Sequence, residues 1–145
     1  MADQVARLPR PAMEIDTEPY WQACRRHELR MQRCSNCGTV RFPPRAICYE
    51  CGSFEHEWAL MSGRGKVYSW VVPHHPVHPG AVNLVPYACV LIELEEGPRM
   101  ISTIVDCPWK EIRADMPLEL VWDDLDEELT LPKFRRADHP PGDEG

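Results

Sequence analysis

The chain has 145 residues, of which 43% are hydrophobic and 27% charged, a composition typical of globular domains and not of disordered chains. A chain of this length forms one domain or two small lobes and buries about two thirds of its unfolded surface. No apolar run approaches the roughly 20 residues of a membrane span, and residues 2–12 lack the apolar core of a signal peptide. We therefore expect a cytoplasmic protein with its own hydrophobic core and no membrane association.

Charge is distributed unevenly along the chain. The net charge is −7, yet residues 1–57 contain eight basic and eight acidic residues, whereas residues 58–145 contain eight basic and fifteen acidic ones. Six arginines lie between residues 25 and 45, against a single acidic residue, Glu28. This basic segment predicts either a surface that binds an anion or a partner, or an ordinary solvated face.

The first residues predict an extended arm followed by one helix. Residues 1–15 contain two prolines and no sustained hydrophobic period. Asp16 or Thr17 is a suitable N-cap, because an acidic residue and a proline follow in the first turn, where both are favourable. The apolar side chains of Tyr20, Trp21 and Cys24 share one face of the helix. We therefore expect a helix that ends near residue 28 and packs on the protein's own core, with contact between its aromatic face and a partner as the alternative.

Four cysteines form the most specific motif of the sequence. Cys34 and Cys37 form one Cys-x-x-Cys-Gly motif, and after a ten-residue spacer Cys48 and Cys51 form a second. Each pair predicts a tight knuckle, and two knuckles supply the tetrahedral sulfur shell that suits Zn²⁺. Four thiolates leave no open position for water or substrate, which predicts a structural zinc. A rubredoxin-like iron site for electron transfer is the alternative.

Residues 58–136 alternate between strand-forming runs and turn signals. Runs rich in β-branched, aromatic and aliphatic residues predict five strands, at residues 66–72, 87–94, 99–105, 118–122 and 129–134. A long loop, residues 73–85, follows the first of them. Five antiparallel strands leave two bare edges unless the sheet closes. We therefore predict a five-stranded OB-type barrel, with an open sheet under helical cover as the alternative.

These segments together predict a mainly β protein in four parts. An N-terminal arm and helix occupies residues 1–28, a rubredoxin-like zinc ribbon residues 29–57, and an OB-fold residues 58–136. Residues 137–145 are polar and contain proline and glycine, which predicts a disordered tail.

The remaining cysteines and the acid-rich turn give weaker signals. Cys24 and Cys89 fall on faces expected to be buried, so we interpret them as core residues. Cys107 has no base beside it in the sequence that would activate a nucleophile. The acidic turn at residues 123–128 is expected to be a solvated loop.

Three histidines lie close together in the loop at residues 73–85. His74, His75 and His78 offer enough imidazole groups for a second metal ion or for acid–base catalysis. No carboxylate lies nearby in the sequence to orient them, and a loop with several prolines is a poor catalytic platform. Contact with a ligand or a partner is the interpretation that we favour, and an enzyme that uses this loop or Cys107 is the alternative.

The order of several short motifs resembles a known family. The motifs are Leu-Arg-Met-Gln-Arg-Cys at residues 29–34, the two cysteine knuckles, Phe-Pro-Pro-Arg at 42–45, Ser-Gly-Arg-Gly at 62–65, Pro-Tyr at 86–87 and Thr-Leu-Pro-Lys-Phe at 130–134. Their succession resembles the zinc-ribbon/OB-fold proteins catalogued as domain of unknown function 35. The resemblance covers roughly residues 16–136.

The resemblance implies a small companion subunit of a thiolase-superfamily enzyme in acyl-CoA metabolism. Known settings of the family are acetoacetyl-CoA and hydroxymethylglutaryl-CoA synthesis in archaea, and steroid side-chain degradation, where a related domain supports a thiolase-like retro-aldolase. In such a hetero-oligomer the partner carries the catalytic residues. This chain would then be no enzyme itself, and would support assembly and the passage of CoA or the acyl group.

Basic and imidazole side chains are the candidates for contact with acyl-CoA or with the partner, because cationic groups pair with phosphates and carboxylates. The candidates are Arg41, Arg45, Arg64, Lys66, His75, His78, Lys133 and Arg135. A single-stranded nucleic-acid module is the alternative function, because zinc ribbons and OB barrels both bind such strands. The acidic second half of the chain argues against it, since phosphate contact needs a basic groove.

Overall fold

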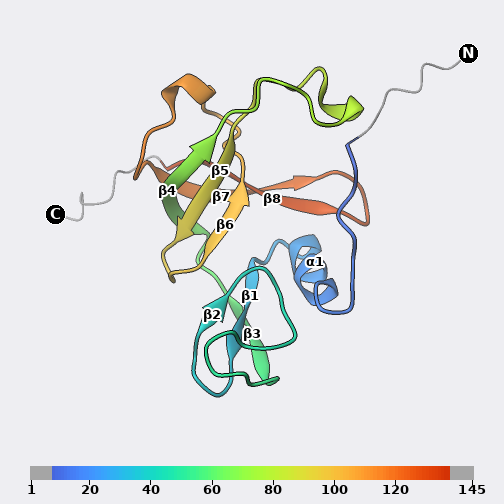
Figure 1. Ribbon diagram of the computed structural model, residues 1–145, viewed down its shortest axis with the longest axis vertical. Helices are drawn as coiled ribbons and strands as arrows, with labels where there is room; N and C mark the ends of the chain where they lie inside the picture. Colours follow the sequence, from blue (N-terminus) through green and yellow to red (C-terminus); the bar gives the residue numbers. More distant parts are fainter. Residues whose placement is uncertain (1–7, 138–145) are drawn as a thin grey trace, which may run out of the picture.

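The computed structural model describes residues 8–137, which form one α-helix, two antiparallel sheets and two short 3-10 turns (Figure 1). The helix is α1 (Glu18–Arg25). The first sheet has the order β2-β1-β3 and consists of β1 (Arg30–Cys34), β2 (Val40–Arg41) and β3 (His56–Leu60). The second has the order β6-β5-β4-β7-β8 and consists of β4 (Arg64–Val71), β5 (Cys89–Leu94), β6 (Arg99–Ser102), β7 (Pro117–Asp124) and β8 (Thr130–Arg136). The 3-10 turns are η1 (Pro79–Ala81) and η2 (Trp109–Glu111).

The two sheets occupy opposite ends of the long axis of the molecule (Figure 1). The three-stranded sheet with its cysteine loops, which we call the ribbon, lies at one end, and the five-stranded sheet, which we call the barrel, lies at the other. α1 lies beside the junction, and the loop between β4 and β5 lies at the barrel end, away from the ribbon (Figure 1). The predicted architecture of helix, ribbon and OB-type unit is therefore confirmed.

The helix is shorter than its sequence predicts because its last turn is closed by backbone geometry. His27 has a φ of +60°, a left-handed conformation that ends α-helices, and the N–H of Glu28 returns to the carbonyl of Ala23. At the other end Thr17 is the residue before the helix, but its hydroxyl accepts the N–H of Glu14 and caps no helical N–H. The buried face of α1 is formed by Tyr20, Ala23 and Cys24.

The ribbon is held together by β1, which pairs with both β2 and β3. Cys34 lies opposite His56 in the pairing with β3, and Gln32 lies opposite Arg41 in the pairing with β2. The sequence did not predict these strands, because they are short and rich in charged or polar residues. The boundary expected between residues 57 and 58 lies within β3.

The barrel forms because the five-stranded sheet curls until its two edges meet. The segment after β6 runs beside β8 through a parallel bridge between Ile104 and Phe134. The N–H of Val105 donates to the carbonyl of Phe134 at 2.8 Å, and the N–H of Phe134 donates to the carbonyl of Thr103 at 3.0 Å. All five predicted strands are present, and the bonds between β8 and the segment after β6 satisfy part of both edges.

One hydrophobic core runs through the junction. Buried barrel residues, among them Val67, Ile92 and Phe134, belong to the same contact cluster as Tyr20 of α1 and Met31 of β1. Burial of this apolar surface stabilises the ribbon and the barrel against each other. The helix and the two sheets therefore share one hydrophobic core. The small ribbon needs no core of its own.

The acidic turn between β7 and β8 has a structural role that its sequence did not reveal. Asp126 forms a bidentate ion pair with Arg10 of the N-terminal arm, with its shorter contact at 2.7 Å. Asp124 lies 2.9 Å from Nε2 of His27, whose ring also stacks on Trp122 with the centroids 5.5 Å apart. The expected solvated loop is exposed, but it also anchors the arm and the end of α1.

Two further predictions concern membrane-spanning segments and the C-terminal tail. Within residues 8–137, no helix has the length and apolar character needed to cross a bilayer. The tail predicted at residues 137–145 lies, apart from residue 137, outside the described residues.

Candidate zinc centre and arginine cavity

The four predicted cysteines converge at the tip of the ribbon. The sulfur atoms of Cys34, Cys37, Cys48 and Cys51 all lie within 4.8 Å of one another. Across the two knuckles, Cys34 Sγ lies 3.5 Å from Cys51 Sγ, and Cys37 Sγ lies 3.6 Å from Cys48 Sγ. Among the described residues this is the only such group of cysteine, histidine or carboxylate ligands.

The two knuckles share one backbone conformation. Gly38 has a φ of +78° and Gly52 a φ of +77°, the left-handed region that favours glycine. The N–H of Gly38 donates to the carbonyl of Cys34, and the N–H of Gly52 donates to the carbonyl of Cys48, both at 2.9 Å. The glycine that follows each cysteine pair thus lets the chain turn sharply enough to aim both sulfurs at one point.

Two of the four sulfurs lie beside hydrogen-bond donors that favour the thiolate, the form in which cysteine binds a metal ion. The backbone N–H of Cys37 lies 3.5 Å from Cys34 Sγ, and this hydrogen bond is the main cause that lowers the pKa of Cys34 to about 6. The hydroxyl of Thr39, 3.2 Å from Cys37 Sγ, is the main cause that lowers the pKa of that cysteine. Four sulfur donors complete a tetrahedral shell, so the donor set fits a closed, structural Zn²⁺ site.

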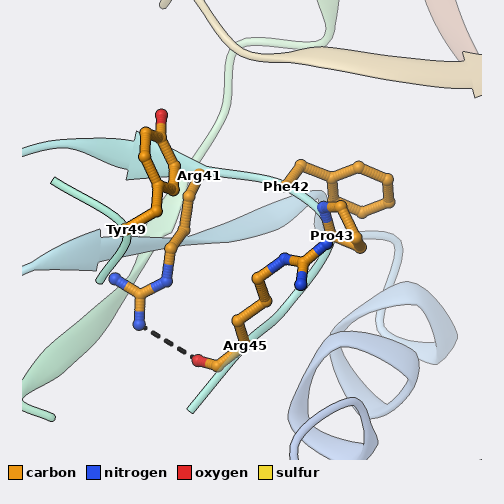
Figure 2. A pocket seen from close by; sticks show the side chains of 5 residues that line it. All are labelled: Arg41, Phe42, Pro43, Arg45 and Tyr49. Atoms are coloured by element: carbon orange, nitrogen blue, oxygen red, sulfur yellow. Dashed lines mark hydrogen bonds between the residues drawn. The ribbon is translucent and has the colours of Figure 1, made fainter. Parts of the chain in front are cut away.

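A cavity of about 400 Å³ lies next to the second knuckle (Figure 2). Its walls are Arg41, Phe42, Pro43, Arg45 and Tyr49. The side chain of Arg41 runs beside the ring of Tyr49, and its Nη2 donates to the carbonyl of Arg45 at 3.1 Å (Figure 2). Arg41 is only 2% exposed, whereas Arg45 and Tyr49 lie at the surface. Two of the predicted ligand residues, Arg41 and Arg45, therefore come together here.

Polar contacts behind the cavity hold the backbone of Arg45 in place. The side-chain carbonyl of Gln32 accepts the backbone N–H of Arg45 at 2.8 Å, and its amide nitrogen lies 3.3 Å from Nε2 of His56. Gln32 is 1% exposed, so these bonds satisfy a buried amide. The segment that carries Arg45 is thereby tied to β1 and β3.

A second cavity of about 250 Å³ extends from the ribbon to the turn between β5 and β6. It shares Arg41, Phe42 and Tyr49 with the first cavity and adds Arg99 at the start of β6. The guanidinium of Arg99 lies 3.7 Å from the ring centre of Tyr68 and also donates to Glu93. Tyr49 and Arg99 are lining residues that the sequence did not predict. Tyr49 lies between the ligands of a knuckle, which was a usable signal, but the approach of Arg99 depends on the tertiary fold.

Four of the predicted ligand residues are placed elsewhere, in ion pairs on the barrel. Arg64 pairs with Glu95, Lys66 with Asp115 and Glu93, Lys133 with Asp123, and Arg135 with Glu119. None of the four lines either cavity. Their charges are balanced by carboxylates across the strands, so they are less available to an anionic ligand than Arg41 and Arg45.

The three histidines of the β4–β5 loop do not converge. His74 packs edge-on against Trp109 with the ring centres 5.3 Å apart, and Nδ1 of His78 accepts the N–H of Gly80 at 2.9 Å. His75 is exposed. Within residues 8–137 they form no group with metal-ligand geometry, so the alternative of a second metal at this loop has no support.

The other cysteines lack the features of an activated nucleophile. Cys24 is fully buried, and burial raises its pKa to about 11. Burial is also the main cause that raises the pKa of Cys107, which favours the unreactive thiol. Cys89 is half-buried rather than a fully enclosed core residue.

Two family profiles match the chain. Residues 21–57 match "ChsH2, rubredoxin-like zinc ribbon domain", and residues 58–123 match "ChsH2, C-terminal OB-fold domain". Among curated proteins, a probable enoyl-CoA hydratase alpha subunit of Thermomonospora curvata is 42% identical over 91% of this chain and 41% of its own length. A DUF35 domain-containing scaffold protein of Methanothermobacter thermautotrophicus is 36% identical over 80% of this chain and 88% of its own length.

A thiolase subunit and a solved structure extend these similarities. The benzoylsuccinyl-CoA thiolase subunit BbsA of Thauera aromatica is 30% identical over 63% of this chain and 61% of its own length. A chain of the solved structure "Ltp2-ChsH2(DUF35) aldolase" is 41% identical, with a TM-score of 0.79 over 88% of this chain and 98% of that chain. The chain spans about two fifths of the length of the hydratase alpha subunits that it matches. From its zinc ribbon, its OB-fold and these similarities, the chain belongs to the ChsH2-type DUF35 family.

Proposed function

We propose that this chain is a non-catalytic accessory subunit that binds a thiolase-superfamily enzyme acting on acyl-CoA. The observation that carries the proposal is the similarity to a chain of an aldolase whose name joins Ltp2 with ChsH2(DUF35). The match covers 88% of this chain and 98% of that chain. Relatives named scaffold proteins and a relative named a thiolase subunit support the same role. Thiolase or retro-aldolase chemistry, as in steroid side-chain degradation, is the reaction class that we propose for the partner.

The chemistry of the described residues agrees with a supporting role. The zinc centre has four sulfur donors and therefore no position for a substrate. The thiols of Cys24 and Cys107 have raised pKa values. We propose that the catalytic groups belong to the partner and that the zinc holds the ribbon in shape for binding. Zinc binding by four thiolates requires reduced cysteines, so we propose a reducing, cytoplasmic setting for this complex.

The β4–β5 loop is the surface that we propose for docking the partner. Residues 67–92 contain no Asp, Glu, Lys or Arg, although 27% of the whole chain is charged. Several apolar side chains on this stretch are exposed, with Val77 at 86% and Val82 at 55%. The centres of protein interfaces are depleted in charge, so an uncharged, exposed, apolar segment fits an apolar partner surface. His75 and His78 lie in the same loop and would contact the partner there.

The arginine cavity is the part of the chain that we propose for contact with the acyl-CoA or with an acidic group of the partner. Arg41 and Arg45 converge there, whereas the other basic candidates form ion pairs on the barrel. The cavity lies at the ribbon, and the docking loop lies at the opposite end of the barrel (Figure 1). A partner that uses both would therefore contact the long side of the molecule.

The test is co-expression with the thiolase-like protein encoded beside this chain, followed by size-exclusion chromatography. We expect one peak that contains both chains. Val77→Asp places a charge in the uncharged loop and should abolish or strongly weaken the complex, while the matched control Leu125→Asp, in the turn between β7 and β8, should leave it intact. Separate elution of the wild-type chains would contradict the proposal, and equal effects of the two variants would contradict the assignment of the loop.

A further inference from the structure

A buried arginine without a charge partner forms one wall of the cavity at the second knuckle. Arg41 is 2% exposed, and neither Nε nor Nη1 has a hydrogen-bond partner among the described residues. Nη2 donates only to the neutral carbonyl of Arg45, and no carboxylate in the described part of the chain pairs with this guanidinium. Buried charges in proteins are normally paired, because taking an ion out of water is costly. The positive field of Arg41 is therefore available to a negative group in the cavity.

The rest of the cavity suits an organic anion. Arg45 is exposed, lines the same cavity and can move to meet a ligand, and no acidic side chain lines the cavity. Phe42, Pro43 and Tyr49 supply flat, apolar walls (Figure 2). A volume of about 400 Å³ lies in the range of small-molecule sites and far exceeds the space that a bare phosphate or carboxylate fills.

We infer that this cavity binds an oxyanion, a phosphate or a carboxylate, that is carried on a flat or apolar organic group. Arg45 contacts the oxyanion directly, because a guanidinium matches the geometry of both groups. Arg41 stabilises it from within the wall, where the low dielectric strengthens the field of an unpaired charge. The organic part lies against Tyr49 and Phe42. This inference rests on the cavity named in the proposed function and deepens that proposal, since it gives the chemistry of the ligand and assigns the site to the chain alone, whatever its partner.

The experiment is a titration of the isolated, zinc-loaded, ¹⁵N-labelled chain, followed by NMR. Phenyl phosphate and benzoate carry the two oxyanions on the same ring, and benzamide is the neutral counterpart of benzoate. We expect saturable shifts at the backbone N–H groups of Phe42, Arg45 and Tyr49 with phenyl phosphate, with benzoate, or with both, and none with benzamide. The relative affinities of phenyl phosphate and benzoate then show whether the cavity prefers a phosphate or a carboxylate. No saturable shift with either anion, or equal shifts with benzamide, would overturn the inference.

Variants test whether the two arginines are responsible. Arg45→Gln should weaken anion binding about tenfold, the effect expected for losing one charge-assisted hydrogen bond. Arg41→Met keeps the buried volume without the charge and should weaken binding at least as much. The matched control Arg113→Gln removes an exposed arginine outside both cavities and should leave the affinity unchanged. If Arg45→Gln and Arg113→Gln bound the anion with equal affinity, the assignment of the site would be contradicted. This comparison holds even if Arg41→Met failed to fold.

One other role for Arg41 predicts a different outcome. A tetrathiolate zinc centre carries a net negative charge, and Arg41 could serve only to balance it. In that case Arg41→Met would lower the affinity for zinc, measured by competition with a chelator, and leave the binding of phenyl phosphate unchanged. That result would overturn the inference. Loss of anion binding with unchanged zinc content would support it.

Discussion

At the scale of single residues, the zinc ligands are the side chains on which the ribbon most depends. The ribbon has three short strands and shares the core of the barrel, so its distal tip has few apolar contacts of its own. Metal binding energy is folding energy in segments of this kind. The four sulfurs, and not the surrounding packing, are therefore expected to fix the tip that carries Tyr49 and Arg45.

Loss of one ligand should release the metal and the tip together. We expect the wild-type chain to hold one zinc ion and to be colourless, and Cys51→Ser to lose most of the zinc and to unfold at a lower temperature. Cys89→Ser, a substitution of a cysteine outside the group, should keep the full zinc content. Metal analysis with thermal unfolding measures both effects. A red, iron-containing chain, or unchanged stability without zinc, would show that this account of the centre is wrong.

The hydrogen bonds of Asp124 with Thr130 and His27 make stability depend on pH. Hydrogen bonds from Thr130 and then His27 lower the pKa of Asp124 below its usual range near 4. A carboxylate with a lowered folded-state pKa adds stability that is complete above the unfolded-state pKa and is lost as the pH falls through the folded-state value. Asp124→Asn should therefore lower the melting temperature at pH 6 and have less effect well below pH 4.

The control for this prediction is a carboxylate outside the contact. Glu55 makes no side-chain hydrogen bond or ion pair in the described part of the chain, so Glu55→Gln should change the melting temperature little at either pH. The same loss of stability by Asp124→Asn at pH 3 and at pH 6 would contradict the role of the ionised carboxylate.

At the scale of elements, the close approach of β4 and β5 requires a glycine at position 65 of the barrel. A Cβ atom on Gly65 would lie 2.6 Å from the carbonyl oxygen of Glu93 and 3.0 Å from a methyl group of Ile92. Because the nearest atom belongs to the backbone of β5, the strands would have to separate. We expect Gly65→Ala to destabilise the chain by about 1–3 kcal/mol, the usual cost of overpacking. Ser69→Ala, at an exposed position of the same strand, should cost much less in urea unfolding.

The sequence predicts the barrel strands better than the ribbon strands, for a physical reason. Runs such as residues 89–94 are rich in β-branched and aliphatic residues, so their composition alone predicts a strand, and the structure buries every second side chain of this run. β2 has two residues and β3 is charged at its start, so neither carries such a signal. The end of α1 depends on the left-handed backbone of His27, which no hydrophobic period reveals.

The same distinction holds for the site. The cysteine group follows from spacing alone, because a knuckle is local. Arg41 and Arg45 lie four residues apart and were predicted as candidates, but the burial of one and the exposure of the other depend on the sheet. The ion pairs that engage Lys133 and Arg135 join neighbouring strands, so they follow from the register of β7 and β8.

At the scale of the whole molecule, the shared core gives the chain a rigid body with two separate surfaces. The arginine cavity lies at the ribbon, and the uncharged loop lies at the far end of the barrel (Figure 1). A rigid spacer between two contact surfaces can fix the position of a partner, and it needs no catalytic group of its own. This arrangement agrees with the proposed role as an accessory subunit of an acyl-CoA enzyme.

The most direct test of that role is the acyl-CoA cleavage activity of the purified thiolase-like partner, measured with increasing amounts of this chain. The account predicts little activity from the partner alone and none from this chain alone. Activity should rise with added chain until a fixed stoichiometric ratio is reached. Full activity of the partner by itself, or turnover of acyl-CoA by this chain by itself, would contradict the account.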